Sequence, residues 1–410
     1  ISQGTGANVV IPNGGIKMIV ADGAGSGAAV TDVLDMTGGT GNVGLGSGNL
    51  GTAITTGTDN VAIGEASLDA VTTGSENTAV GDNAAGATTT GANNTAIGAS
   101  ALLVNSTGAG NTALGRKTLL DSTTGDYNTA IGISALENNT TADNNTAIGK
   151  SSLKTNTTGA GNTAIGTEAL NANTTASNNT AVGYSALVAN TTGTDNVAVG
   201  ANAADANTTG SDNTAIGDNA LGANTTASNN TAVGSSALVA NTTGADNTAV
   251  GSQAGDAITT GASNTLLGKN AGGAITTGNN NIAIGDVALD ASTTASNNTA
   301  VGYSALSANT TGTANSALGK DALAANTTGD QNVAVGMDAL TANTTADNNT
   351  AIGTEALLVN TTGASNTAVG QGALGANTTA SNNTAVGKAA LLANTTGASN
   401  TSVGYTSLDA

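Results

Sequence analysis

The stretch NTAVGYSALVANTTGTD, residues 179–195, is one copy of a unit that recurs without insertion or deletion from Asn60 to Ala410. Twenty-one copies follow one another, the last of them truncated, and we number the positions of each copy 1 to 17 from its first Asn. A fixed period of this size is typical of a solenoid, in which each repeat forms one coil and buries its apolar side only by stacking on its neighbours. The period therefore predicts a solenoid of 17-residue coils over residues 42–410.

Two positions never vary: position 1 is Asn and position 5 is Gly in every copy. Gly reaches positive φ without steric cost, and Asn tolerates the left-handed region while its side chain bonds local backbone groups. We therefore expect this pair to bracket a short strand with turns and the Asn side chains to form a ladder. A ligand site would predict one special copy instead of twenty-one equal ones. The expected structural turn residues are exemplified by Asn60, Gly64, Asn196, Gly200, Asn400 and Gly404.

Between these corners the sequence reads T-A-[VI], whose alternation places positions 2 and 4 on one face of a strand and position 3 on the other. Position 4 is always Val, Ile or Leu, and Val61 shows that position 2 accepts an apolar side chain, so both are expected to point into the coil. The Leu column at position 9 should fill the interior opposite them. The expected core residues are exemplified by Ile63, Val199, Leu68 and Leu187.

Ala occupies position 3 in nearly every copy, which indicates close approach of another surface. We expect Ala62, Ala79 and Ala198 to pack against sister chains in an oligomeric rod. Positions 13 and 14, usually Thr-Thr, should begin a second strand. A helical interpretation fails, because Gly, Asn and β-branched residues recur too often within seventeen residues. The predicted fold class is all-β, a parallel β-solenoid or β-roll, and its coils, stacked about 4.8 Å apart, should form a rod on the order of 100 Å long.

The composition excludes several functions. The net charge is −19 with only eight basic residues, which argues against nucleic acid or an anionic membrane as partner. No apolar run is long enough to insert in a membrane. The chain has no His, no Cys and one Arg, Arg116, so we expect no catalytic residues and no cofactor. No metal site is expected either, because acidic residues such as Asp59 and Glu65 do not recur in each copy.

Residues 1–41 follow another pattern: ANVVI (7–11), a PNGG turn (12–15) and IKMIV (16–20). These segments predict a small β-rich module with a hairpin that covers the first coil. Because the chain begins at Ile1 and ends within a repeat, we expect it to be a fragment of a longer polypeptide.

The repeat resembles those in the head domains of trimeric autotransporter adhesins, whose N-S-V-A-I-G motif is approached by residues 60–64 (NVAIG) and 196–200 (NVAVG), each without the Ser. That resemblance covers about residues 42–410 and implies a left-handed β-roll assembled as a trimer. The head repeats are commonly shorter. The leading segment, residues 9–35, is similar to modules in tail-fibre and appendage proteins of marine and cyanobacterial phages.

We therefore expect a structural shaft of a virion tail fibre or appendage, which spaces a host-recognition element from the particle. Its expected partners are copies of itself, other virion proteins and, through parts outside this segment, a host receptor. The alternative is the head of a bacterial adhesin at the cell surface. A further alternative is an ice-binding solenoid, suggested by the Thr columns at positions 13 and 14.

Overall fold

The computed structural model describes residues 19–21, 30–32, 41–50 and 54–408. It divides into two compact units, Ile1–Thr194 and Asp195–Ala410, and each unit is described by itself. Throughout the described residues the regular elements are β-strands and none is a helix. The predicted fold class is confirmed: each unit contains a parallel β-solenoid of 17-residue coils.

In the first unit, the strands of successive coils pair in parallel with residues seventeen apart, as Thr78 pairs with Thr95. The first step differs, because Val43 pairs with Val61 across eighteen residues. The strands are β3 (Val43–Leu45), β4 (Val61–Ile63), β5 (Thr78–Val80), β6 (Thr95–Ile97), β7 (Thr112–Leu114), β8 (Thr129–Ile131), β9 (Thr146–Ile148), β10 (Thr163–Ile165) and β11 (Thr180–Val182).

The second unit repeats this arrangement with the same register, as Val333 pairs with Thr350. Its strands are β12 (Val197–Val199), β13 (Thr214–Ile216), β14 (Thr231–Val233), β15 (Thr248–Val250), β16 (Thr265–Leu267), β17 (Ile282–Ile284), β18 (Thr299–Val301), β19 (Ser316–Leu318), β20 (Val333–Val335), β21 (Thr350–Ile352), β22 (Thr367–Val369), β23 (Thr384–Val386) and β24 (Thr401–Val403).

Before the solenoid, β1 (Ile19–Ala21) pairs with β2 (Val30–Asp32) in an antiparallel ladder. The predicted strand at 7–11 and the PNGG turn at 12–15 lie outside the described residues.

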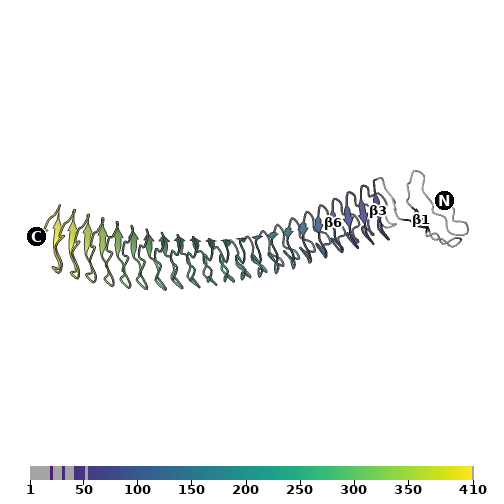
Figure 1. Cartoon of the computed structure of the whole chain (residues 1–410). Coiled ribbons are helices and arrows are strands. Elements are labelled where there is room, and N and C mark those ends of the chain that lie inside the picture. Colours follow the sequence, from purple (N-terminus) through teal and green to yellow (C-terminus); the bar gives the residue numbers. More distant parts are fainter. Residues whose placement is uncertain (1–18, 22–29, 33–40, 51–53, 409–410) are drawn as a thin grey trace. The chain divides into compact units, whose positions relative to one another are not determined.

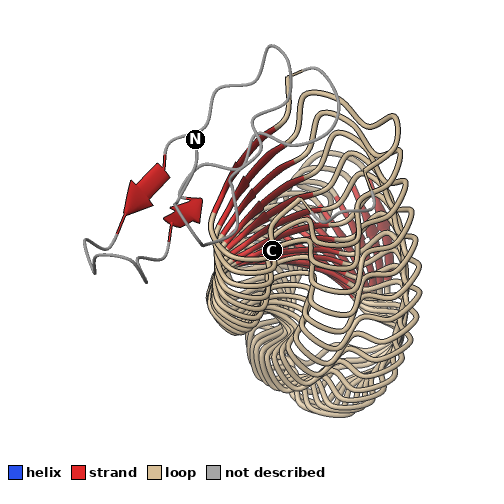
Figure 2. Ribbon diagram, turned by 90° about the vertical axis from the view of Figure 1, so that its right-hand side faces the viewer, coloured by secondary structure: helices blue, strands red, loops and turns tan. Residues whose placement is uncertain are grey.

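Each coil contains one strand of three residues, and turns make up the rest of its circumference (Figure 1). Figure 2 shows the strands gathered on one side of the coils. The prediction of a second strand at positions 13 and 14 is wrong. The N–H groups of Thr259, Thr260 and Gly261 all point at the carbonyl oxygen of Thr276 in the next coil, at 2.9, 3.3 and 3.2 Å. A β-ladder needs alternating donors and acceptors, whereas these donors converge on one acceptor.

The strand alternation was predicted correctly, but the two faces were exchanged. Ala62, Ala79 and Ala198 are fully buried inside their own coil, so they do not form the predicted interface between chains. Ile63 and Val199, predicted to be core residues, are 38% and 36% exposed. The interior is too thin for Val or Ile on the strand opposite the Leu column, and Ala fits there instead.

The Leu column at position 9 is confirmed as the core, with Leu68 and Leu187 fully buried. These residues adopt the left-handed region, at φ of 50° and 51°. That conformation costs a non-Gly residue about 1–2 kcal/mol. Burial of a Leu side chain contributes about 1.5–3 kcal/mol, which offsets the backbone strain.

One pair of coils shows how tightly the interior volume is fixed. Leu266 takes the place of the position-3 Ala and is fully buried. In its own coil and the preceding one, position 9 is Gly272 and Gly255 instead of Leu. A Cβ atom added at these glycines would lie 2.8 Å and 2.6 Å from the methyl groups of Leu266. The strand therefore carries a large core residue only where the facing positions have lost theirs.

This exchange gives a direct test of which strand face is inside. We expect Leu266→Ala to destabilise the protein by about 3–5 kcal/mol, because the facing residues Gly255 and Gly272 have no side chain to fill the cavity. Leu267→Ala, one residue further along the same strand and 37% exposed, should cost about 1 kcal/mol or less. Chemical denaturation followed by circular dichroism measures both. A larger loss for Leu267→Ala would show that the faces have been assigned the wrong way round.

Candidate functional site

The invariant Asn at position 1 forms a hydrogen-bonded ladder through the interior of the coils. The Oδ1 atom of Asn60 accepts bonds from the backbone N–H and the Nδ2 of Asn77, both at 3.0 Å. Nδ2 of Asn77 also donates to the carbonyl oxygen of Gly91 at 2.9 Å. Asn264 in the second unit repeats these contacts. The predicted ladder is confirmed, and Asn60 and Asn196 are buried within it.

The left-handed residue at this corner is not the Asn. It is the preceding position 17, for example Asp59 and Glu76 at φ of 59° and 60°. The role predicted for Gly at position 5 is confirmed, with Gly64, Gly200 and Gly404 at φ of 130°, 138° and 132°. Position 1 therefore supplies a buried amide, and its neighbours supply the turns.

A second Asn ladder, which sequence reasoning did not predict, runs along position 12. Nδ2 of Asn326 donates to Oδ1 of Asn309 at 2.9 Å and to the carbonyl oxygen of Gly329 at 3.0 Å. Asn315, at position 1 of the same coil, also donates to the Gly329 carbonyl oxygen, at 2.8 Å. One carbonyl at position 15 thus joins both ladders. The repeated phrase NTT was the signal for the second ladder.

The second ladder is interrupted where position 12 is not Asn. Ile258 follows Asn241 in this column, and the buried Oδ1 of Asn241 has no hydrogen-bond partner. Ser122 follows Asn105, whose Oδ1 is also unpartnered. The Oδ1 of an Asn at position 12 accepts a hydrogen bond from the Nδ2 of the position-12 Asn in the next coil. Any other residue at position 12 of the next coil therefore removes the donor.

Charged groups lie on the outside and do not converge. Lys154 and Glu137, at position 10 of neighbouring coils, form an ion pair at 3.5 Å. Partial burial raises the pKa of Asp256, with a smaller contribution from the charge of Asp290, and burial together with the charge of Asp286 raises the pKa of Asp290. In the described part of the chain, no three His, Cys, Asp or Glu residues are placed to hold a metal ion.

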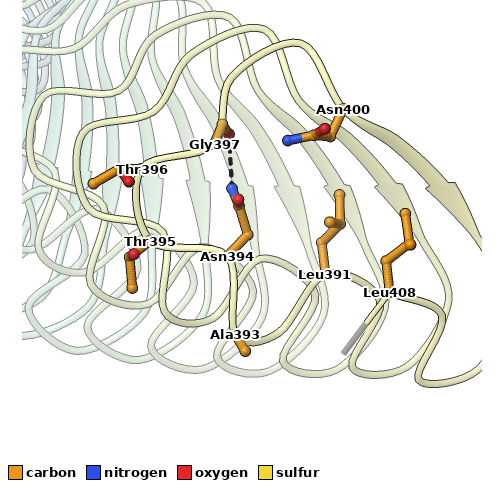
Figure 3. Close-up of a pocket in the computed structure, with 8 residues that line it drawn as sticks. All are labelled: Leu391, Ala393, Asn394, Thr395, Thr396, Gly397, Asn400 and Leu408. Atoms are coloured by element: carbon orange, nitrogen blue, oxygen red, sulfur yellow. Dashed lines mark hydrogen bonds between the residues drawn. The ribbon is translucent and has the colours of Figure 1, made fainter. Parts of the chain in front are cut away.

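The described surface includes an open hollow at the last coil and an apolar hollow in the second unit. The first, drawn in Figure 3, is lined by residues such as Leu391 and Asn394. The residues at the same positions of other coils are covered by the next coil, so this hollow is the interior of a coil. The second is an apolar hollow of about 320 Å³ in the second unit, between Leu358 and Leu392 where Gly375 intervenes. It is lined by Glu355, Leu358, Val359, Gly372, Gly375, Ala376 and Leu392. Glu355 is its one charged group, so it lacks a catalytic constellation.

The extended surface formed by positions 2 and 4, which we call the strand face, carries the clearest indication of a functional surface. Position 4 is exposed by 39% at Ile216, 37% at Ile284 and 40% at Ile352. It is nevertheless Val, Ile or Leu in all copies, and no copy has a charged residue at position 2 or 4. Strand propensity alone would also allow Thr at position 4 and would give no preference to the Leu found at Leu114 and Leu318. Apolar character itself has therefore been kept on an exposed face.

The ladder at position 1 predicts that Asn→Asp substitutions at two positions of the same coil differ greatly in their effect on stability. Asn332 is fully buried, donates to Asn315 Oδ1 and the Ala346 carbonyl, and accepts from the Asn349 N–H. Asn332→Asp removes both donors and buries a carboxylate, so we expect a loss of about 3 kcal/mol or more at neutral pH.

The matched control for that substitution is Asn348→Asp, at the exposed position 17, where other copies carry Asp195 and Asp246. It should be nearly neutral. Thermal unfolding of the two variants in parallel measures the difference. Burial raises the pKa of an introduced carboxyl, so the defect at position 332 should diminish as the pH falls and the group becomes neutral. Equal stability of the two variants would contradict the ladder.

No helix among the described residues is long and apolar enough to cross a membrane. Comparison with protein-family models, with curated proteins and with solved structures found no match to this chain.

Proposed function

We propose that the chain is a structural shaft segment of an extracellular fibre, of the kind that virion tail fibres and appendages use, and that copies associate through the strand face. The observation that carries the proposal is the apolar column at position 4, which is exposed or half-buried and is kept in every copy. The Asn ladder at position 1, which continues from coil to coil within each unit, supports it, because this ladder stabilises stacking equally in every regular coil and singles out no special site.

A second copy of the same chain is the partner that best suits the strand face. A face without charges meets no like-charge repulsion from its own copy, although the chain carries a net charge of −19. Parallel copies in register would set one column of Val and Ile against another over many coils. We expect three copies, in keeping with the sequence resemblance, with the strand faces directed at the common axis.

Light scattering on the purified chain tests the association, and the expected mass is three times 38.4 kDa. The triple variant Ile216→Lys, Ile284→Lys and Ile352→Lys should be a folded monomer. The control places Lys at position 6 of the same three coils, with Asp218→Lys, Asp286→Lys and Thr354→Lys; position 6 carries Lys naturally at Lys269 and Lys320. This control should stay trimeric. A wild-type monomer would overturn the association.

The location is tested separately by electron microscopy with an antibody against the repeat. Label along an appendage of a virus particle supports the shaft. Label on the surface of a bacterial cell would indicate the adhesin instead, and label inside the particle would contradict both.

A further inference from the structure

A second exposed column, on a different part of the coil, has no role in the fold. Position 14 is Thr in all twenty copies that contain it, from Thr73 to Thr396, and each is exposed. Within the described residues, none of these hydroxyl groups makes a hydrogen bond to the protein, whereas the neighbouring position-13 hydroxyl does, as Thr276 Oγ1 donates to the Thr293 carbonyl oxygen at 3.0 Å. Figure 3 places Thr395 and Thr396 on the corner between Asn394 and Gly397.

Other Thr columns in the same coils accept substitutions that position 14 does not. Ser106 replaces Thr at position 13, and Val61 and Ser316 replace it at position 2. Positions 6 and 17, which are mostly exposed, and positions 7, 10 and 16, which are mostly half-buried, vary widely, so the copies have diverged. At position 14 neither the methyl group nor the hydroxyl group has been lost in any copy.

The fold alone does not account for this restriction. If β-branching for backbone conformation were the requirement, Val or Ile would serve as they do at position 2. If a small polar residue were the requirement, Ser would serve. A hydroxyl group that bonds nothing in the protein, and a methyl group beside it, are kept together, which points to a partner outside the chain.

The geometry indicates a partner with its own repeat. Successive coils lie about 4.8 Å apart, so position 14 forms a row of equally spaced hydroxyl and methyl groups. The adjoining position-13 side chains are held in place by their bonds to the next coil, for example Thr259 Oγ1 to the Thr276 carbonyl at 3.2 Å and Thr327 Oγ1 to the Thr344 carbonyl at 2.9 Å. Two adjoining Thr columns therefore run along each unit, and the side chains of the position-13 column are fixed in conformation.

We propose that the Thr columns at positions 13 and 14 bind ice. The hydroxyl groups hydrogen-bond to water at a spacing close to the oxygen repeat of the ice lattice, and the methyl groups order the water between them. Positions 13, 14 and 15 carry no charged residue in any copy, so no strongly hydrated group disturbs this layer. A crystalline polysaccharide is also periodic, but no Tyr occurs between positions 10 and 16 to stack on a sugar.

The test uses the full chain, thermal hysteresis in an osmometer and partition of the labelled protein into growing ice. Wild type should show hysteresis and enter the ice. One variant places Lys at position 14 of every second coil of the second unit, so that no two neighbouring coils in that stretch keep the row. Its substitutions are Thr226→Lys, Thr260→Lys, Thr294→Lys, Thr328→Lys and Thr362→Lys.

The matched control has the same number of Lys residues in the same coils, at position 17. Its substitutions are Asn229→Lys, Ser263→Lys, Asn297→Lys, Gln331→Lys and Ser365→Lys. The position-14 variant keeps an unbroken row only in the first unit, so it should show clearly less hysteresis than the wild type while keeping the wild-type circular dichroism spectrum. The control should keep its hysteresis. A third variant with Val at the same five position-14 sites keeps the methyl groups and should lose much of the effect.

Three results would overturn the proposal: exclusion of wild type from ice without hysteresis, equal loss in the position-14 and position-17 variants, or binding to crystalline cellulose or chitin in place of ice. Because the strand face is on another side of the coil from these substitutions, such a failure leaves the fibre-shaft proposal standing, and light scattering on the same variants reports on that proposal independently.

Discussion

Deletion of residues 213–229 is expected to leave a folded, soluble solenoid that is one coil shorter. The deletion removes one complete repeat, so Asn230 takes the place of Asn213: its N–H donates to Asn196 Oδ1 and its Oδ1 accepts from the N–H of the next Asn. Stability in a solenoid is roughly a sum over coils and their interfaces. The melting temperature should therefore change little.

Deletion of residues 213–230, one residue more, is expected to be severely destabilising. It removes the position-1 Asn of the next coil and leaves the Oδ1 of Asn196 and the N–H of Asn247 without their partners. At about 1–3 kcal/mol for each unsatisfied buried group, the deletion costs several kcal/mol. The coils before and after the junction should then unfold independently of each other. Thermal unfolding should show two transitions, and proteolysis should cut at the junction.

A coil with one extra residue is the informative control for the coil that lacks its position-1 Asn. The coil from Asn42 to Asp59 already has eighteen residues, yet its strand pairs with the next one in register. Deletion of residues 213–228, which produces an eighteen-residue coil, should be tolerated better than deletion of 213–230. If all three deletions were equally stable, the register of the repeat would not determine the structure.

Gly200→Val is expected to lower stability by about 2–6 kcal/mol, because backbone strain and overpacking add together at this position. Gly200 has φ of 138°, a region that is essentially restricted to Gly. A Cβ atom there would overlap the carbonyl oxygen of Gly217 in the next coil and lie 2.6 Å from its carbonyl carbon. Neither contact can be relieved by a side-chain rotation, since both atoms belong to the backbone.

The control lies two residues further along the same coil. Asn202→Ser should be nearly neutral, because Asn202 has φ of 53° and other copies place Ser236 and Ser304 at this position with similar φ values. Gly200→Ala already introduces the overlapping Cβ atom and should show most of the effect of Val. Melting temperatures measure all three variants, and an unchanged value for Gly200→Val would refute the turn geometry.

The period, the corner residues and the Leu core could be predicted because each rests on a single residue type at one position. Position 5 is Gly since only Gly accepts its conformation, and position 1 is Asn since its amide must both donate and accept. Alternation along a strand shows that two faces exist, but it does not show which one is inside. The inward face depends on interior volume, which becomes visible only when Leu266 is compared with Gly255 and Gly272.

Other features were beyond sequence reasoning because they contradict residue preferences. Bulky side chains rarely adopt left-handed φ, so the values at Leu68 and Leu187 had no signal in the propensities. Thr-Thr at positions 13 and 14 has the composition of a strand, yet the converging donors of Thr259 and Thr260 make it a corner. In both cases the stacked neighbour decides the local conformation.

The Asn ladders also have a mechanical consequence, because their bonds run from coil to coil in the direction of stacking. A force that pulls a unit apart along this direction loads the interfaces one after another. Each interface that opens frees one seventeen-residue coil. That coil extends by roughly 50 Å, the difference between a stretched chain and the stacking distance. Under tension each unit should therefore lengthen in equal steps and recover coil by coil when the force is released.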